Sequence, residues 1–202
     1  MAEFKVNPDH VHAFKDMKTL ETWYRRNHAK EDELWIKVHK KDSGLASVSI
    51  TDALDVALCW GWIDAIRKSF DDKSYLQRYT PRNKTSIWSK KNIGNVARLI
   101  KAGRMTEFGQ SEIDRAKKDG RWDRAYDSGA KLETPPDLLA AIKAEPKAQA
   151  LYETLSAQNR FALAFRTHHM KTEAGRKKKI ETLVAMLKRG ETIYPNGKGK
   201  AK

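Results

Sequence analysis

Apolar residues alternate with polar residues along residues 33–40, where every second side chain from Leu34 onward falls on one face. This spacing predicts a strand with one buried face, and it puts Trp35 among the residues of the opposite, polar face. In residues 20–27, apolar side chains instead recur at three- and four-residue intervals, which predicts a helix that Thr19 caps. The chain is therefore expected to begin with a helix followed by a strand.

The stretch ALCWGWIDAIRKSF, residues 57–70, predicts two elements that meet at Gly61. Residues 53–60 continue an apolar pattern at helical spacing. Ser49 stands where it can cap this helix, and Thr51 is a rival cap. Gly61 occupies a position where helices commonly end, because glycine adopts the left-handed conformation without a Cβ clash. Residues 62–70 are then expected to form a strand.

A turn at residues 71–73 connects this strand to a second one at residues 74–80, which Pro81 ends. The two strands are expected to form an antiparallel hairpin. Because side chains alternate along a strand, one face of the first strand carries Trp62, Asp64, Ile66, Lys68 and Phe70.

From residue 89 onward the apolar spacing is helical. One helix is predicted from Ser89 toward Gly103, and another from about Ser111 to Gly120. A loop that ends at Pro135-Pro136 separates these helices from a helical tail. In that tail three helices are predicted, at about residues 136–144, at 147–167 with an interruption near Ser156, and at 172–189.

The fold class predicted from these elements is α+β, with a small antiparallel sheet and flanking helices followed by a C-terminal helical portion. We expect the α+β portion to span residues 1–130 and the helical module to span residues 131–192. Residues 193–202 are polar and rich in glycine, so we expect this end to be disordered.

Composition is that of a packed globular protein, since 40% of the 202 residues are hydrophobic. No apolar run reaches the ~18 residues of a membrane-spanning helix, and the N-terminus lacks the basic-then-apolar layout of a signal peptide. We therefore expect no membrane span and a cytoplasmic location. The single cysteine cannot form an internal disulfide, which fits a reducing compartment.

The formal net charge of +14 is unevenly distributed, because residues 147–202 carry 13 Lys and Arg but 4 Asp and Glu. Arg25-Arg26 and residues 176–179 supply positive charge of the kind that contacts phosphate. No known nucleic-acid-binding motif accompanies them, and four consecutive helical residues fan out around the axis. Sequence-independent nucleic-acid binding therefore stays open beside a solvated, lysine-rich surface.

The histidines and the cysteine are not spaced like a metal site or a catalytic centre. Cys59 lies near a predicted helix C-terminus, where the helix dipole disfavours a thiolate, so we expect a buried structural thiol. The chain also lacks a G-x-S-x-G elbow, a Walker loop and a glycine-rich dinucleotide motif. We predict no metal ion, no cofactor and no catalytic residue. The histidines lie in unrelated elements or point apart on a helix: His10, His12, His28, His39, His168 and His169.

The best candidate site lies on the predicted hairpin and the segment that leaves it, which reads RYTPRNKTSIWSKKN. A carboxylate, guanidinium groups and tryptophans brought together there could bind a small anion or polar ligand. The alternative is structural, with Asp64 paired to an arginine of the neighbouring strand beneath aromatic side chains. The candidate ligand-binding residues are Trp62, Asp64, Arg78, Arg82, Trp88 and Asn92.

A family resemblance rests on several segments in order. They read ELWIKVHKKDSG, SITDALDVALCWGWIDAIRKSFDD, QRYTPRNKTSIWSKKN, LIKAGRMTEFGQSEIDRAKKDGRWDRAY and, in the tail, LSAQNRFALAFRTHHMKTEAGRKKKIETLVAMLKRG. Over residues 14–190 the chain resembles the YdeI/OmpD-associated family, also called bacteriocin-protection proteins. The tail departs from the family pattern at TEAGRKKKI, where a more regular K-T-x-E-T-R-x-x-R-I arrangement is expected. The most distinctive motifs are matched by Gly61, Trp62, Asp64, Arg78, Arg82, Trp88, Ser89 and Asn92.

The resemblance implies a bacterial protein linked to bacteriocin tolerance or stress, and it transfers no catalytic residue or cofactor. We expect a non-enzymatic protein that acts by binding a protein partner or a small anionic ligand. Two alternatives stay open: an enzyme whose pocket holds Asp64, Arg78 and Arg82, and a sequence-independent nucleic-acid-binding protein.

Overall fold

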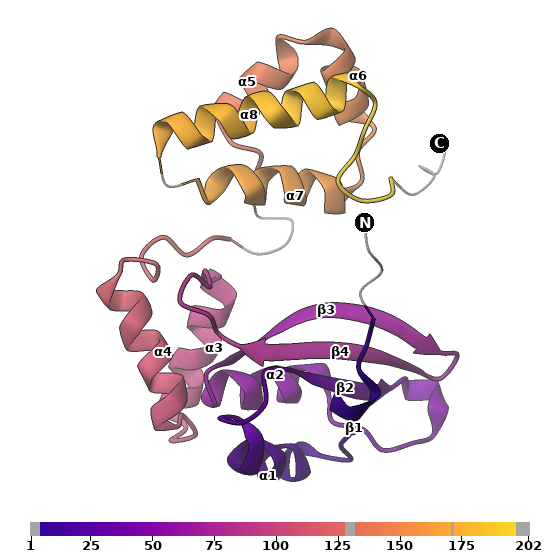
Figure 1. Cartoon of the computed structure of the whole chain (residues 1–202), viewed down its shortest axis with the longest axis vertical. Helices are drawn as coiled ribbons and strands as arrows, with labels where there is room; N and C mark the ends of the chain where they lie inside the picture. Colours follow the sequence, from indigo (N-terminus) through magenta and orange to yellow (C-terminus); the bar gives the residue numbers. More distant parts are fainter. Residues whose placement is uncertain (1–4, 128–131, 171, 197–202) are drawn as a thin grey trace. The chain divides into compact units, whose positions relative to one another are not determined.

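The computed structural model describes residues 5–127, 132–170 and 172–196 (Figure 1). The chain divides into two compact units, here called the sheet unit (Met1–Ala125) and the helical unit (Tyr126–Lys202). Each unit has a hydrophobic core of its own.

The described part of the sheet unit combines a four-stranded sheet with α-helices and short 3-10 helices. In chain order these elements are η1 (Pro8–His10), β1 (Val11–Ala13), α1 (Met17–Asn27), β2 (Leu34–His39), η2 (Lys41–Ser43), α2 (Ile50–Cys59), β3 (Trp62–Asp71), β4 (Ser74–Pro81), α3 (Lys90–Lys101) and α4 (Glu107–Lys118).

The sheet has the strand order β1-β2-β4-β3. Both β2 and β3 pair antiparallel with β4, so the predicted hairpin is confirmed, whereas β1 pairs parallel with β2. The α+β class followed by a helical portion is confirmed, but the sheet is mixed rather than purely antiparallel. Helix α1 lies between β1 and β2 in the chain and forms the crossover connection that parallel neighbouring strands require.

The hairpin contains a β-bulge between Asp64 and Arg67. The side chain of Gln77, on β4, fills it: Nε2 donates to the backbone oxygens of Ala65 (3.1 Å) and Ile66 (3.3 Å). Its Oε1 accepts a hydrogen bond from Nε of Arg67 (3.0 Å). Gln77 is buried, so its amide supplies the hydrogen bonds that the interrupted backbone pairing leaves out.

Helices α1 and α2 cover one face of the sheet (Figure 1). Residues directly opposite one another on antiparallel strands share a face, and Tyr79 lies opposite both Leu34 and Asp64. Leu34 and Tyr79 are fully buried in the core under these helices. Trp35, predicted on a polar face, is also fully buried.

The ends of α1 and α2 follow from their local sequence. Ser49 accepts a hydrogen bond from the backbone N–H of Asp52 (3.0 Å), which confirms it as the cap of α2. Gly61, with φ +75°, has the left-handed conformation expected after that helix. The cap of α1 is Asp16 rather than the predicted Thr19, because the Asp16 carboxylate accepts the N–H of Thr19 (2.8 Å) and the helix starts earlier.

Helices α3 and α4 pack with the end of α2 around a second core. Helix α4 begins at Glu107, before the predicted start near Ser111, because Thr106 caps it. A Cβ atom on Gly109 would lie 2.4 Å from the backbone oxygen of Cys59. Only glycine allows α4 to approach α2 this closely.

The described part of the helical unit packs four helices around its core, and a break near Ser156 confirms the predicted interruption. Asp137 and Arg176 form an ion pair (2.6 Å), and Arg176 also donates to the backbone oxygen of Thr167 (2.9 Å), which joins the first, third and last helices. These helices are α5 (Pro136–Lys143), α6 (Pro146–Glu153), α7 (Ala157–His168) and α8 (Glu173–Lys188).

The segment after α8 returns to α7. The side chain of Asn159 accepts the N–H of Tyr194 (2.9 Å) and donates to its backbone oxygen (3.0 Å). Residues 193–202, predicted to be disordered, are described as far as Asn196, and the remainder lies outside the described residues. In the described ranges, no helix combines the length and apolar character needed to cross a membrane.

Candidate functional site

The predicted site residues on the hairpin do not all converge. Asp64 lies opposite Tyr79, and Arg78 is the next residue along β4, so Asp64 and Arg78 lie on opposite faces of the sheet. Nε of Arg78 forms an ion pair with Glu33 (2.7 Å). The two residues therefore do not share a pocket.

Trp62 belongs to the core of the sheet unit, with 1% of its surface exposed. Its ring makes edge-to-face contacts with Trp23 (5.9 Å between centroids) and Tyr24 (5.3 Å). This packing is the structural role that the sequence left open, although one end of Trp62 also lines a cleft described below.

Arg82 and Trp88 lie together at the exit of the hairpin. The Arg82 guanidinium lies 3.7 Å from the Trp88 ring centroid and donates to the backbone oxygen of Ile87 (3.3 Å). Both side chains are buried, so their cation–π contact holds the exit segment against the core. Asn92 lies in the first turn of α3, where its backbone N–H donates to Ser89 (3.1 Å).

Asp64 is exposed beside the bulge. Crowding by surrounding protein atoms raises the pKa of its carboxyl group, whereas a backbone hydrogen bond and the charges of Arg82, Lys91 and Arg67 act in the opposite direction. More than a third of the residue remains accessible to solvent, so the crowding is partial. Asp64 is thus a surface carboxylate in a positive environment.

A cleft of about 210 Å³ lies where five elements of the sheet unit meet at Gly61, and we call it the Gly61 cleft. It lies between the ends of α1, α2 and β4 and the starts of β3 and α4. Its lining residues are His28, Ala29, Trp60, Gly61, Trp62, Pro81, Arg82, Phe108, Ser111 and Glu112.

Three rings form an aromatic wall in the Gly61 cleft. Trp60 and Phe108 are stacked at 5.7 Å with an interplanar angle of 15°, and the His28 ring contacts both, at 4.7 Å and 4.1 Å. Nδ1 of His28 lies 2.8 Å from the backbone oxygen of Tyr24, which can only accept, so Nδ1 carries a proton. This bond fixes the orientation of the ring.

The polar side of the Gly61 cleft carries the Arg82 guanidinium and the Glu112 carboxylate. Burial raises the pKa of Glu112, while the charges of Arg115, Arg82 and Arg121 act to lower it. Glu112 is in direct contact with Arg115, which also donates to the backbone oxygen of Arg82 (3.4 Å). Arg115 thus pairs directly with Glu112, whereas Arg121 is itself paired with Asp119 (2.7 Å).

Two predicted residues, Trp62 and Arg82, line the Gly61 cleft, but sequence analysis missed its other functional groups. His28, Trp60, Phe108 and Glu112 come from three helices or their ends, and nothing in their spacing brings them together. The available signal was Gly61. A Cβ atom there would lie 3.0 Å from the backbone oxygen of Phe108, so the glycine marks the close approach that builds the cleft.

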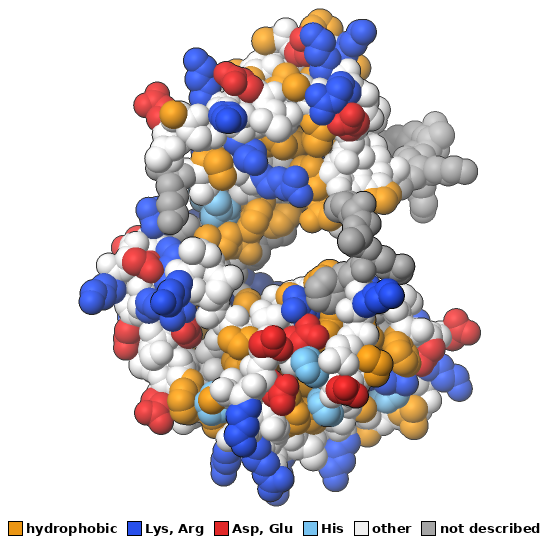
Figure 2. Space-filling view, viewed as in Figure 1, with side chains coloured by type: hydrophobic (Ala, Val, Ile, Leu, Met, Phe, Trp, Pro, Cys, Tyr) orange, Lys and Arg blue, Asp and Glu red, His pale blue; other side chains and the backbone are white. Residues whose placement is uncertain are grey.

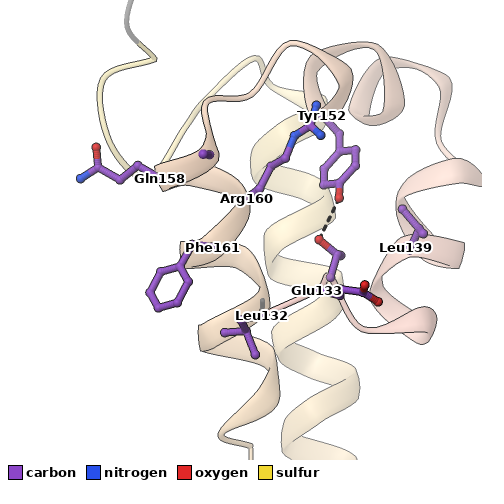
Figure 3. A pocket seen from close by; sticks show the side chains of 9 residues that line it. Leu132, Glu133, Leu139, Tyr152, Gln158, Arg160 and Phe161 are labelled. Carbon is purple, nitrogen blue, oxygen red and sulfur yellow. Dashed lines mark hydrogen bonds between the residues drawn. The ribbon is translucent and has the colours of Figure 1, made fainter. Parts of the chain in front are cut away.

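A second cavity, of about 640 Å³, lies in the helical unit (Figure 3), and we call it the α7 groove. At its edge the Tyr152 and Thr134 hydroxyls are hydrogen-bonded (2.8 Å), and the Arg160 guanidinium lies 5.2 Å from the Tyr152 ring centroid. The groove is lined by Leu132, Glu133, Thr134, Leu139, Tyr152, Ala157, Gln158, Arg160 and Phe161.

Cys59 is buried next to the Gly61 cleft but does not line it. Burial raises the pKa of its thiol to about 11, so the reactive thiolate is scarce at neutral pH. Over residues 5–127, 132–170 and 172–196, no cluster of three or more His, Cys, Asp or Glu side chains is arranged to hold a metal ion.

The fold and its cavities define the class: an α+β unit with an aromatic cleft, followed in the same chain by a helical unit with a groove. A family model described as a domain of unknown function (DUF8412) matches residues 12–112, half of the chain, and the chain belongs to this family. A second model, described as "Bacteriocin-protection, YdeI or OmpD-Associated", matches residues 131–190, which confirms the predicted resemblance there. No curated protein and no solved structure is significantly similar to the chain.

Proposed function

We propose that the chain is a ligand-binding protein and that its Gly61 cleft holds a small, flat carboxylic acid. The observation that carries the proposal is the pairing of an aromatic wall with the Arg82 guanidinium, while Arg115 lies close by and pairs with the Glu112 carboxylate. Trp60 and Phe108 offer ring faces to a flat ligand, and Arg82 and Arg115 favour a negative charge beside it.

The size of the cleft favours a small ligand. Sites for drug-sized molecules have volumes of roughly 300–1,000 Å³, and the Gly61 cleft, at about 210 Å³, lies below that range. A single aromatic ring with a carboxylate is the chemistry that suits this volume and this lining.

The surrounding sequence adds to the positive field. Residues 73–106 carry nine Lys and Arg and no Asp or Glu, and this segment includes the end of β4, all of α3 and the cap of α4. A field of one sign raises the local concentration of an oppositely charged ligand. Glu112 is the only acidic residue among those that line the cleft.

The enzyme, nucleic-acid-binding and bacteriocin-tolerance hypotheses receive different degrees of support. An enzyme built on Asp64, Arg78 and Arg82 loses support, because Asp64 and Arg78 lie on opposite faces of the sheet. Nucleic-acid binding stays a prediction; on the face seen in Figure 2, Lys and Arg side chains are interspersed with Asp and Glu side chains. The match of residues 131–190 to the bacteriocin-protection model supports a role in tolerance. That the chain exercises this role through ligand binding is part of our proposal.

Calorimetric titration with benzoate and benzylamine tests the proposal, because these probes differ mainly in the sign of their charge. We expect benzoate to bind, and Phe108→Ala to weaken it about fivefold through loss of the ring contact. The matched control is Phe70→Ala, which removes an exposed ring of β3 that lies outside the cleft.

Glu112→Gln separates the charge from the shape of the cleft. Removing the carboxylate is expected to strengthen benzoate binding and to weaken any binding of benzylamine. The raised pKa of Glu112 predicts a pH effect in the same direction. As the pH falls, this carboxyl group is neutralised before an ordinary one, and benzoate binding is expected to strengthen. Tighter binding of benzylamine than of benzoate, or equal effects of Phe108→Ala and Phe70→Ala, would refute the proposal.

A further inference from the structure

We propose that the α7 groove is a second binding site, which takes an amphipathic carboxylic acid with its acyl chain in the groove and its carboxylate at Arg160. This inference goes beyond the proposed function, because it concerns another unit and another ligand shape. It rests on the dimensions and lining of the groove, the position of Arg160 and the charge of the unit.

The groove has the dimensions and lining of a ligand site. Its volume of about 640 Å³ falls within the range typical of sites for organic ligands. Leu139 comes from α5, Phe161 comes from α7, and Leu132 precedes both, so apolar side chains of three segments line the cavity. An extended hydrocarbon chain can cover these side chains without needing a hydrogen bond.

Arg160 provides a charged group at a fixed position. Its guanidinium lies over the Tyr152 ring, and its Nη2 donates to the backbone oxygen of Glu153 (2.8 Å). A guanidinium has five N–H donors, so most of them remain available beyond this bond, and the side chain is exposed. A carboxylate is the group that pairs with two of these donors at once.

The hydroxyl pair of Thr134 and Tyr152 adds a second polar contact inside the groove. In Figure 3 the Glu133 carboxylate lies away from Arg160, on the side of Leu139, so it does not neutralise the guanidinium. Arg160, Tyr152 and Thr134 thus form one polar group of the groove, apart from the Glu133 carboxylate.

The net positive charge of the helical unit favours a ligand with a negatively charged head group. Residues 126–202 carry 15 Lys and Arg against 8 Asp and Glu. An anionic amphiphile is attracted to this unit at long range, and a cationic one is repelled. We therefore commit to a carboxylate rather than an amine or an uncharged alcohol.

The test compares decanoate, decylamine and decanol, which share one chain and differ in the head group, by calorimetric titration of the full chain. Decanoate is expected to bind most tightly. Arg160→Met keeps the apolar stem but removes the charge, and it is expected to weaken decanoate binding about tenfold. Arg166→Met, on the exposed side of the same helix, is the matched control and should leave binding unchanged.

Two further variants keep the result interpretable. Arg160→Lys keeps the positive charge but lacks the planar guanidinium, and it should recover part of the affinity for decanoate. Such a recovery would show that Arg160→Met weakens binding through loss of the charge and not through unfolding. Phe108→Ala, in the Gly61 cleft, should leave decanoate binding unchanged, so failure of this site and failure of the proposed function are distinguishable. Decylamine or decanol binding as tightly as decanoate, equal effects of Arg160→Met and Arg166→Met, or no binding of decanoate would overturn the proposal.

Discussion

Nη2 of Arg98 lies 2.7 Å and 2.8 Å from the two carboxylate oxygens of Asp55. Asp55 is buried on α2, while the side chain of Arg98, on α3, is about half exposed. Arg104 approaches the same carboxylate at 3.8 Å and also pairs with Glu21 of α1 (3.3 Å). One buried carboxylate therefore links three helices of the sheet unit.

Replacing Arg98 with alanine should destabilise the sheet unit. Asp55 would stay buried with only the more distant Arg104 as a partner, which costs about 1–3 kcal/mol of unfolding free energy. Urea denaturation followed by tryptophan fluorescence measures this loss. Lys101→Ala, on the same helix and exposed, is the control and should change stability by less than about 0.5 kcal/mol. Equal stabilities of the two variants would contradict the linking role of Asp55.

Two glycine-to-alanine substitutions should have opposite effects. At Gly109 the new Cβ would meet backbone oxygens of Cys59 and Leu58 at 2.4 Å and 2.7 Å, so α4 is forced away at a cost of about 1–3 kcal/mol or more. At Gly94, inside α3, nothing lies within 4 Å, and alanine should stabilise the helix by up to about 1 kcal/mol. Thermal melting distinguishes them, and a stable Gly109→Ala protein would show that the α2–α4 contact is not tight.

The carboxyl group of Asp71 should titrate at an unusually low pH. A hydrogen bond from Ser74 (2.7 Å), with others from Lys73 and Lys37, lowers its pKa from 3.8 to about 2, although its burial acts in the opposite direction. Because the folded pKa is lowered, the stability it contributes is present above pH 3.8 and lost as the pH falls through about 2. Carbon-13 NMR of the carboxyl group measures this value, and Ser74→Ala should raise it. Titration near 3.8 in the unmodified protein would contradict the assignment.

Local sequence determined the elements that were predicted well. Gly61 ends α2, Ser49 caps it, and Ser156 interrupts the tail helices, each through a hydrogen bond or a backbone conformation that its own residue type favours. The parallel pairing of β1 was not predicted, because three residues are too few to show alternation. The cap of α1 was misplaced, because Asp16 and Thr19 are both residue types that commonly cap helices. The residue at which the backbone becomes helical determines which of them is the cap.

The candidate sites were harder to predict than the fold. The predicted hairpin places Trp62 and Arg82 at one end of the sheet, where both line the Gly61 cleft. The pairing register of the strands could not be predicted from side-chain alternation, so the ion pair of Arg78 with Glu33 on the other face was missed. The Gly61 cleft depends on His28 and Phe108, which are 80 residues apart in the chain and meet only through tertiary packing. Residue spacing carries no information about such a contact.

The bulge on β3 has a consequence for how the protein behaves at high concentration. β3 is an outer strand of the sheet, and ten residues of exposed backbone would ordinarily be a template for another chain. Gln77 draws two successive carbonyl groups, those of Ala65 and Ile66, toward β4. The outward row of donors and acceptors is thereby broken in the middle, so an incoming strand finds no continuous register. We expect this interruption, together with the charged side chains that β3 carries, to oppose strand-by-strand aggregation.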